Sequence, residues 1–405
     1  MRAGEVAEDA ASGRKAAYTC QERAGKRRST VAAGPARSPV PGLVRCSRAD
    51  PLQPGRSPLP ERLRFCRNRP ARPARRRGGV GVRERPRVFV TRQVPEGALA
   101  PLEGWAEVEV WPEFLPPPRA ELARRLAVAD GVITMITDRI DDGLLAGAPR
   151  LRVVSNCAVG YDNVDVQAAQ RRGILVTHTP GVLTEATADL AMALILACAR
   201  RLPQAEADLR AGRWTTWHPL QWLGLELDGA TLGIVGLGRI GRAVARRARA
   251  FGMQVLYSSR RRHPDAEEEL GVAYADLDSL LARSDIVTLH VPLTPETRHL
   301  LDGRRLARMK PGAILINTAR GGVVDEQALV EALRQGHLAM AGLDVYGQEP
   351  VPPHHPLLQL PNVIALPHIG SATRRTRWRM ARLAAENCAA VLRGLRPPHP
   401  VPEMA

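Results

Sequence analysis

Three polar residues that lie far apart in the sequence are of the types needed to reduce a 2-keto acid. Arg320 lies in the segment NTARGG, Glu349 precedes a proline, and His368 lies in LPHIGSAT. A guanidinium offers paired donors to the carboxylate and carbonyl oxygens of a keto acid. An imidazole titrates near neutral pH and can deliver a proton when a carboxylate orients it. These residues therefore predict a substrate-binding arginine, an acid/base histidine and an orienting glutamate, with the hydride coming from a cofactor.

A glycine-rich turn is the expected binding site for that cofactor. The segment GLGRIG (residues 236–241) follows an apolar run directly and precedes an Ala/Arg-rich helical stretch, residues 242–251. A strand, a tight turn and a helix in this order leave the helix N-terminus free to bind a pyrophosphate. Gly236 would turn tightly, Gly238 would let the backbone reach a phosphate, and Gly241 would let helix and strand approach closely. The pattern predicts dinucleotide binding, and a glycine turn that only packs a helix on a strand is the alternative.

The residues after the next expected strand bear on which nicotinamide cofactor is used. An acidic residue about 20 positions after such a turn accepts the ribose hydroxyls of NAD. This chain has no Asp or Glu between Gly236 and Asp265, and Ser259, Arg260 and Arg261 occupy the strand end. Without a carboxylate to repel it, a 2′-phosphate could bind to the arginines, so NADP(H) is favoured and NAD(H) remains possible. The alternative is a solvated face in an arginine-rich chain.

The order of the expected elements predicts an α/β protein with two parallel sheets. The expected strands of the first series are residues 88–90, 131–136, 152–156 and 174–176, and those of the second are 231–235, 254–257, 285–291, 313–316, 339–343 and 362–366. Six strands in the second series fit a Rossmann-type doubly wound sheet in a cofactor domain at residues 184–371. A discontinuous substrate-binding domain is predicted at residues 86–183 and 372–398.

Each residue of the triplet follows an apolar run of the second series, where ligands bind in open parallel sheets. Taken singly, the arginine could be a surface ion pair, the glutamate an acid at a helix start, and the histidine a packing residue near a strand end. The loop CAVGYDN (residues 157–163) follows the third expected strand of the first series. Its amides near Val159 and Gly160 could bind a substrate carboxylate facing Arg320, and a strand-to-helix turn capped by Asp162 is the alternative.

The first 85 residues differ in composition from the rest. They hold 21 Lys and Arg against 7 Asp and Glu, whereas the other 320 residues hold 37 against 34. With nine prolines and little apolar periodicity, residues 1–85 are predicted to be a disordered basic leader. Three explanations stay open: translated upstream sequence without a role, an organelle transit peptide, or a tail that touches nucleic acid or membrane. The charge excess lies in this leader, so nucleic-acid binding by the body is not expected.

The remaining composition favours a cytoplasmic enzyme without a metal site. The six cysteines form no CxxC pair, as in a reduced protein. The most apolar stretch, residues 190–199, is only about half as long as a membrane crossing. His354 and His355 have no acidic or cysteine neighbours in the sequence, so no metal site is predicted there.

The body of the chain resembles the D-isomer-specific 2-hydroxyacid dehydrogenases, and among them the glyoxylate/hydroxypyruvate reductases. The resemblance covers residues 86–398. It is carried by the blocks TMITDRID (134–141), NCAVGYDNVDV (156–166), TPGVLTEATADLAMALILACARR (179–201), GRWTTWHPLQWLG (212–224), GIVGLGRIGRAVARRARAFGM (233–253), NTARGGVVDE (317–326), AGLDVYGQEP (341–350) and LPHIGSATRRTR (366–377).

The resemblance implies a flavodoxin-like fold for the substrate domain and roles for particular residues. Arg320, Glu349 and His368 would be the substrate-binding arginine, the orienting glutamate and the acid/base histidine, and Val159 and Gly160 would bind the substrate carboxylate. The residues implied in cofactor binding are Leu237, Gly238, Arg239, Ile240, Gly241, Ser259, Arg260, Arg261, Thr318, Ala319, Ile369 and Gly370. The family also implies a homodimer in which Trp217 reaches the partner subunit's active site.

Two other functions are alternatives to glyoxylate and hydroxypyruvate reduction. Phosphoglycerate dehydrogenases belong to the same family, but the chain leaves no room after residue 398 for the regulatory domain that many of them carry. Relatives of this fold also act as NAD(H)-sensing transcriptional corepressors, and the basic leader could then contact nucleic acid. Such proteins can keep the catalytic triplet, so its presence alone does not decide between enzyme and corepressor.

Overall fold

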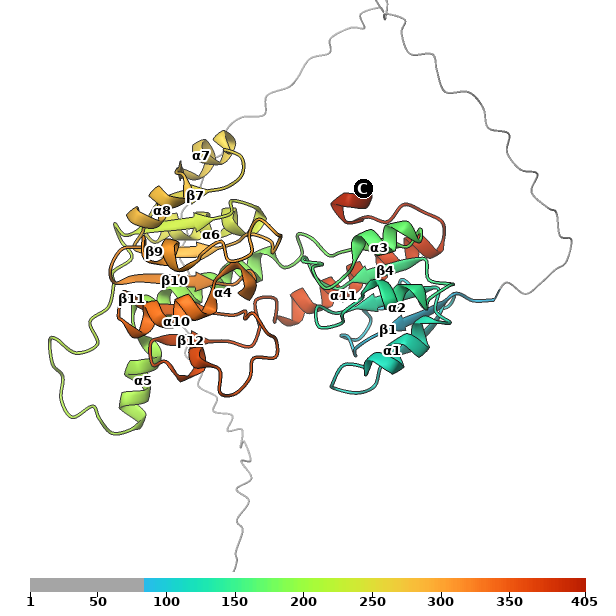
Figure 1. Ribbon diagram of the computed structural model, residues 1–405, viewed down its shortest axis with the longest axis horizontal. Coiled ribbons are helices and arrows are strands. Elements are labelled where there is room, and N and C mark those ends of the chain that lie inside the picture. Colours follow the sequence, from blue (N-terminus) through green and yellow to red (C-terminus); the bar gives the residue numbers. More distant parts are fainter. Residues whose placement is uncertain (1–83) are drawn as a thin grey trace, which may run out of the picture. The chain divides into compact units, whose positions relative to one another are not determined.

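The protein is described by a computed structural model over residues 84–405. The predictions for the leader therefore lie outside the described residues, apart from its last two positions. Within the described part the chain forms two parallel β-sheets with helices against them, which confirms the predicted α/β class (Figure 1). No helix of residues 84–405 is long and apolar enough to cross a membrane.

The first sheet has five parallel strands in the order β2-β1-β3-β4-β5, which is the flavodoxin-like order. The strands are β1 (Arg87–Val90), β2 (Glu107–Val110), β3 (Gly131–Thr134), β4 (Val153–Asn156) and β5 (Leu175–Thr177). The helices between them are α1 (Arg119–Leu126), α2 (Asp142–Ala146) and α3 (Val166–Arg171). The edge strand β2 was not among the expected strands, because its sequence EVEV buries no residue fully.

The C-terminal helix α11 (Arg374–Leu392) packs on this first sheet. The Ser155 hydroxyl on β4 donates a 2.8 Å hydrogen bond to the carbonyl of Ala384 on α11. The chain end also returns to the sheet, since Pro400 pairs with Thr177 in an antiparallel bridge and Val401 is buried. This is the packing that a discontinuous substrate domain requires, although its proposed limits stay a prediction and the tail beyond residue 398 adds to it.

The second sheet has seven parallel strands in the order β12-β11-β10-β9-β6-β7-β8. The strands are β6 (Thr231–Val235), β7 (Gln254–Ser258), β8 (Ala273–Tyr274), β9 (Ile286–Leu289), β10 (Ala313–Asn317), β11 (Leu338–Leu343) and β12 (Val363–Ala365). Starting from β6, six of them follow the Rossmann order, and β12 extends the sheet by one strand. The expected number of six was wrong, because the two-residue edge strand β8 is exposed and has no apolar run to reveal it.

Helices cover both faces of the second sheet. They include α4 (Thr184–Ala199), α6 (Arg239–Ala250), α7 (Pro264–Leu270), α8 (Leu277–Arg283), α9 (Gly303–Leu306) and α10 (Glu326–Arg334). Helix α5 (Leu202–Arg210) instead contacts α4 and buries none of its residues. Alternate residues of β10 enter opposite cores: Ile314 and Ile316 pack in the core with α4 and α6, and Leu315 packs in the core with α8 and α10. This alternation follows from the two-residue repeat of a strand.

The helix after the glycine turn begins earlier than predicted. Helix α6 starts at Arg239, with Gly238 as its N-cap, and not at residue 242. Gly241 therefore lies in the first helical turn, where a side chain would collide with the carbonyl of Gly236. Glycines within the turn concealed this start, since glycine is a poor helix former.

Candidate active site

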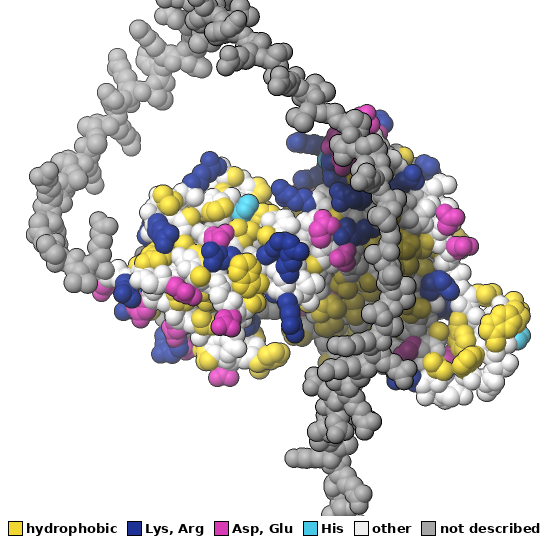
Figure 2. All heavy atoms as spheres, turned by 180° about the vertical axis from the view of Figure 1, so that it is seen from behind, with side chains coloured by type: hydrophobic (Ala, Val, Ile, Leu, Met, Phe, Trp, Pro, Cys, Tyr) yellow, Lys and Arg dark blue, Asp and Glu magenta, His cyan; other side chains and the backbone are white. Residues whose placement is uncertain are grey.

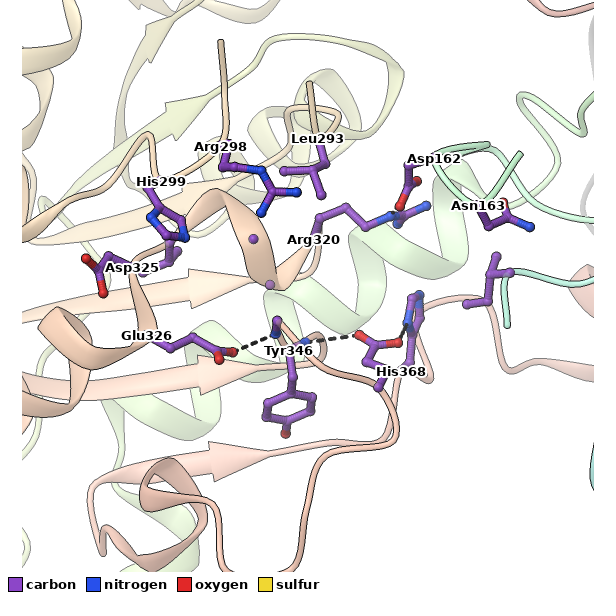
Figure 3. Close-up of a pocket in the computed structure, with 16 residues that line it drawn as sticks. Asp162, Asn163, Leu293, Arg298, His299, Arg320, Asp325, Glu326, Tyr346 and His368 are labelled. Atoms are coloured by element: carbon purple, nitrogen blue, oxygen red, sulfur yellow. Dashed lines mark hydrogen bonds and ion pairs between the residues drawn. The ribbon is translucent and has the colours of Figure 1, made fainter. Parts of the chain in front are cut away.

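A pocket of about 450 Å³ lies where loops after several strands of both sheets meet (Figure 3). It is lined by Ile136, Asp162, Asn163, Leu293, Arg298, His299, Arg320, Gly321, Gly322, Val324, Asp325, Glu326, Tyr346, Gly347, Glu349 and His368. The structure thus brings the predicted triplet of Arg320, Glu349 and His368 into one pocket, although these residues span 49 positions of the chain. Ligand sites at the carboxyl ends of parallel strands are expected for this architecture.

His368 and Glu349 form a short ion-pair contact. The Nδ1 atom of His368 lies 2.6 Å from Oε2 of Glu349, and Oε1 of the same carboxylate accepts a 3.0 Å bond from the amide of Tyr346. Burial alone would raise the pKa of Glu349, but the hydrogen bond and charge of His368 and the Tyr346 amide outweigh it and lower the pKa. Glu349 is therefore ionised at neutral pH and fixes a proton on Nδ1, which leaves Nε2 as the imidazole's second nitrogen.

The backbone around His368 is held by a buried carboxylate that was not predicted. His368 has a φ of 54°, in the left-handed region that non-glycine residues seldom adopt. Asp344, which directly follows β11 and is fully buried, accepts hydrogen bonds from the amides of Ile369 at 2.7 Å and Gly370 at 2.8 Å. Burial raises the pKa of Asp344 and these amides lower it, with a net rise. The two bonds fix the turn that presents the histidine.

Arg320 lies in the pocket with its guanidinium directed toward the first sheet's loops (Figure 3). Its Nε donates a 3.0 Å bond to Oδ1 of Asp162, and Nη1 donates a 2.8 Å bond to the carbonyl of Ala319. Asp162 therefore binds Arg320 and does not cap α3, whose N-cap is Asp165. Because Nη2 has no hydrogen-bond partner within residues 84–405, a donor remains for an anionic ligand.

The loop expected to bind the substrate carboxylate lies beside this guanidinium. A side chain on Gly160 would overlap Nη2 of Arg320, so the two groups are in close contact. Val159 and Gly160 are not lining residues of the pocket, whereas Asp162 and Asn163 of the same loop are. Gly160 of this loop thus lies against the guanidinium of Arg320, and Asp162 and Asn163 of the same loop line the pocket together with Arg320.

The glycine turn has the geometry that a pyrophosphate needs. A side chain on Gly236 would strike the backbone of His290, and Gly236 also has a φ of 99°. Gly238 differs, because nothing lies within 4 Å of where its Cβ would be. Packing therefore does not require a glycine at position 238, and the open space in front of the α6 N-terminus fits a bound phosphate. Leu237 is buried beneath the turn, and Arg239 is exposed on it.

The arginines after β7 fall into two groups. Arg262 binds Glu267 with Nε and Nη2, and the hydrogen bonds from Arg262 and Tyr257 lower the pKa of Glu267 to about 2. Arg260 and Arg261 have no ion pair within residues 84–405 and are exposed, and Ser259 bonds the carbonyl of Arg261. Two guanidinium groups are therefore available to an anion at this strand end.

The other predicted cofactor residues lie at two further strand ends. Thr318 and Ala319 follow β10, and the buried hydroxyl of Thr318 has no hydrogen-bond partner among residues 84–405. Such an orphaned hydroxyl is costly unless a ligand or water pairs with it. Ile369 and Gly370 follow β12, but Asp344 takes their amides, so any cofactor contact there must use other atoms. None of the predicted cofactor residues lines the pocket that holds the triplet.

Trp217, which was predicted to contact substrate, does not line the pocket of its own chain. It is 77% exposed, on the loop that follows α5. Figure 2 shows hydrophobic side chains gathered on this part of the molecule. The exposed apolar residues of α5 and the loop, here called the arm, are Leu202, Leu209, Trp214, Trp217, Leu220 and Leu223. An isolated chain rarely exposes such a cluster without a binding partner.

The sequence around His354 and His355 shows no acidic neighbour, but the fold places one beside His355. His355 lies 3.5 Å from Oε2 of Glu326, a contact across 29 positions that sequence neighbours cannot reveal. Within residues 84–405, no three His, Cys, Asp or Glu side chains are grouped to hold a metal ion.

The chain is similar along most of its body to known reductases. Residues 192–370 match the family model of the NAD binding domain of D-isomer specific 2-hydroxyacid dehydrogenases. A glyoxylate reductase of Aeropyrum pernix is 53% identical over 320 residues, which cover 78% of this chain and 96% of that protein. A glyoxylate reductase of Thermococcus litoralis is 51% identical over 319 residues, with the same coverage of both proteins.

Solved structures give the same result. A protein of Thermus thermophilus superimposes with a TM-score of 0.73 at 55% identity, covering 78% of this chain and 99% of that one. An NADPH-dependent glyoxylate/hydroxypyruvate reductase of Sinorhizobium meliloti, in complex with NADP and malonate, gives a TM-score of 0.70 at 38% identity and covers 79% and 98% of the two chains.

Proposed function

The chain belongs to the D-isomer-specific 2-hydroxyacid dehydrogenases, as the sequence blocks predicted, and from this premise we propose that it reduces glyoxylate to glycolate and hydroxypyruvate to D-glycerate. The observation that carries the proposal is the 2.6 Å contact between His368 and Glu349 in the pocket that also holds Arg320. A bound nicotinamide cofactor would supply the hydride. The similar glyoxylate reductases support the choice of substrate.

Separate side chains bind the substrate, polarise its carbonyl and transfer the proton. Arg320 binds the substrate carboxylate and polarises the carbonyl oxygen through its free Nη2 edge. Glu349 fixes the Nδ1 proton of His368, and Nε2 delivers a proton to the carbonyl oxygen as the alcohol forms. In the oxidative direction the same nitrogen accepts the proton. Gly238, the α6 N-terminus and Thr318 are the proposed contacts of the cofactor.

Steady-state kinetics of the purified full-length chain test the proposal. We expect oxidation of NADPH in the presence of glyoxylate and of hydroxypyruvate, with pyruvate and 3-phosphohydroxypyruvate as comparison substrates. Absence of turnover with both proposed substrates and either nicotinamide cofactor would rule the proposal out. Faster turnover of the phosphorylated substrate would point to a phosphoglycerate dehydrogenase.

We further propose that the enzyme prefers NADPH. Support comes from the exposed guanidinium groups of Arg260 and Arg261, which have no ion pair in the described chain, and from the lack of a carboxylate at Ser259. A 2′-phosphate is a doubly charged acceptor that guanidinium groups bind well, whereas a carboxylate at this strand end would repel it. The similar S. meliloti reductase, which binds NADP, supports this choice.

Exchange of these residues should move the preference toward NADH. In the double variant Ser259→Asp/Arg260→Gln, we expect the ratio of kcat/KM for NADPH to that for NADH to fall about 100-fold, since one charge-assisted contact is lost and a repulsion is added. Arg262→Gln is the matched control, because Glu267 already occupies that guanidinium. A ratio that changes no more in the double variant than in the control would count against the assignment.

We also propose that the protein is a homodimer in which the arm of one chain covers the active site of the other. The exposed indole of Trp217 and the leucines of the arm support this. Aromatic anchors of this kind contribute much of the binding energy at interfaces.

The dimer proposal makes Trp217 important to a site that it does not reach within its own chain. In Trp217→Ala we expect kcat/KM for hydroxypyruvate to fall about tenfold or more, because the aromatic contact that the dimer would bury is lost. Sedimentation equilibrium should give twice the chain mass for the wild type. Trp378→Ala, which alters another exposed tryptophan outside the arm, is the control. A fully active wild-type monomer would exclude the arrangement.

The cytoplasmic location also stays a prediction. Cys157, Cys198 and Cys388 are free, which suits a reducing compartment, and they are buried, which raises the pKa of each thiol to about 12. Fractionation of cells that express the full chain would test it, and recovery in an exported or organelle fraction would contradict it.

A further inference from the structure

Two successive carbonyls of the loop before helix α3 are each bound by a side chain from outside the loop. The imidazole Nδ1 of His178 donates a 2.9 Å hydrogen bond to the carbonyl of Val159. The amide Nδ2 of Asn156 donates a 2.8 Å bond to the carbonyl of Gly160. A carbonyl oxygen only accepts, so the proton of the His178 ring lies on Nδ1.

These two bonds fix the direction of the next two amides. In a trans peptide the N–H points opposite to the C=O of the same unit, so the amides of Gly160 and Tyr161 point away from His178 and Asn156. Neither amide donates a hydrogen bond to any group in residues 84–405. Successive free amides form a concave site for an anion, and Nη2 of Arg320 lies against Gly160 beside it.

Both donors are themselves held in place. The ring of His178 packs edge-on against Tyr161 with centroids 5.5 Å apart, and its backbone carbonyl accepts a 2.9 Å bond from Asn387 on α11. Asn156 is fully buried, and its Oδ1 accepts from the hydroxyl of Thr134 at 3.1 Å. Neither side chain lines the pocket, so any effect on a ligand must pass through the loop.

We propose that His178 and Asn156 are positioning residues that orient two amides toward the substrate carboxylate, beside Arg320: that of Gly160, which the sequence already predicts as a contact, and that of its neighbour Tyr161. The inference rests on the proposed reduction of 2-keto acids and adds the residues that set the affinity for the carboxylate. A donor behind each carbonyl also polarises the peptide unit, which strengthens the amide as a donor on the other side. Loss of the donor therefore weakens carboxylate binding in the ground state and the transition state alike, which raises KM and spares kcat.

The test compares two variants at His178 in the full-length enzyme. His178→Phe keeps a ring against Tyr161 but has no donor, whereas His178→Asn places an amide nitrogen near the position of Nδ1. For His178→Phe we expect the KM for glyoxylate and the inhibition constant of oxamate to rise together by about tenfold or more, with kcat within about twofold and the NADPH dissociation constant unchanged. His178→Asn should recover most of the affinity. Asn156→Leu should repeat the pattern of His178→Phe.

The matched control is His337→Phe, which removes a similar bond from a histidine to a backbone carbonyl, that of Leu306 at 3.1 Å, outside the site. It should leave KM and the oxamate constant unchanged. The inference is overturned if His178→Phe and Asn156→Leu bind glyoxylate and oxamate as the wild type does, or if His178→Asn is as impaired as His178→Phe. A wild-type enzyme that reduces no 2-keto acid would instead overturn the proposed function, and the inference with it.

Discussion

Replacement of His368 by Gln is expected to lower kcat for glyoxylate reduction by about 10²- to 10⁴-fold, the range typical for loss of a positioned acid. The glutamine keeps polar bulk in the pocket but cannot release a proton to the developing alkoxide. Cofactor affinity should be unchanged, because the predicted cofactor residues lie outside the pocket lining. Single-turnover reduction, followed by NADPH absorbance, separates this chemical effect from substrate binding.

Two further variants make the result specific to the ion pair. His354→Gln alters an exposed histidine outside the pocket and should leave kcat unchanged. Glu349→Gln should also lower kcat, because a neutral amide replaces the ionised carboxylate that orients the ring of His368. A His368→Gln enzyme with wild-type kcat would show that another group or water supplies the proton.

The convergence of the triplet could be predicted because it depends on topology. Arg320, Glu349 and His368 each follow a strand of one parallel sheet, and all such strands end at the same edge. Apolar runs identify the strands, so the sequence is enough to place the three residues together. The distance between His368 and Glu349 was not predictable, because it depends on the loop conformation that Asp344 holds.

Residues that act through a partner distant in the sequence were harder to recognise. The sequence around Asp162 suits a helix cap, whereas its contact with Arg320 spans 158 positions. Asp344 directly follows the apolar strand β11, which is a usable signal, but its role depends on two amides 25 and 26 positions later. Short-range patterns carry no information about such contacts.

The arm shows the same limit at the level of assembly. Its apolar residues could be read from the sequence, and their exposure required the fold. Trp217 has no contact with the pocket of its own chain, so no pattern within one chain can assign it a site. The family resemblance implies that Trp217 contacts the active site of a partner chain. Sedimentation equilibrium and the kinetics of Trp217→Ala test this role.

Replacement of Arg320 by Lys separates the charge of the arginine from its geometry. We expect kcat/KM for glyoxylate to fall about 10²- to 10³-fold, because an ammonium group cannot offer paired planar donors to a carboxylate and a carbonyl at once. Part of the loss arises because lysine cannot make both of the bonds, to Asp162 and to the carbonyl of Ala319, that hold the guanidinium with Nη2 against Gly160.

Arg247→Lys is the matched control for this change, since Arg247 also binds carboxylates, those of Glu185 and Asp189, but lies outside the pocket. It should retain nearly full activity. If Arg320→Lys also retained kcat/KM within about threefold, positive charge alone would be sufficient for binding, and the paired-donor role would be wrong. If instead only KM rose, the arginine would bind the carboxylate without polarising the carbonyl, because an interaction made only in the transition state lowers kcat. The split between kcat and KM therefore determines which of the two substrate oxygens the guanidinium serves.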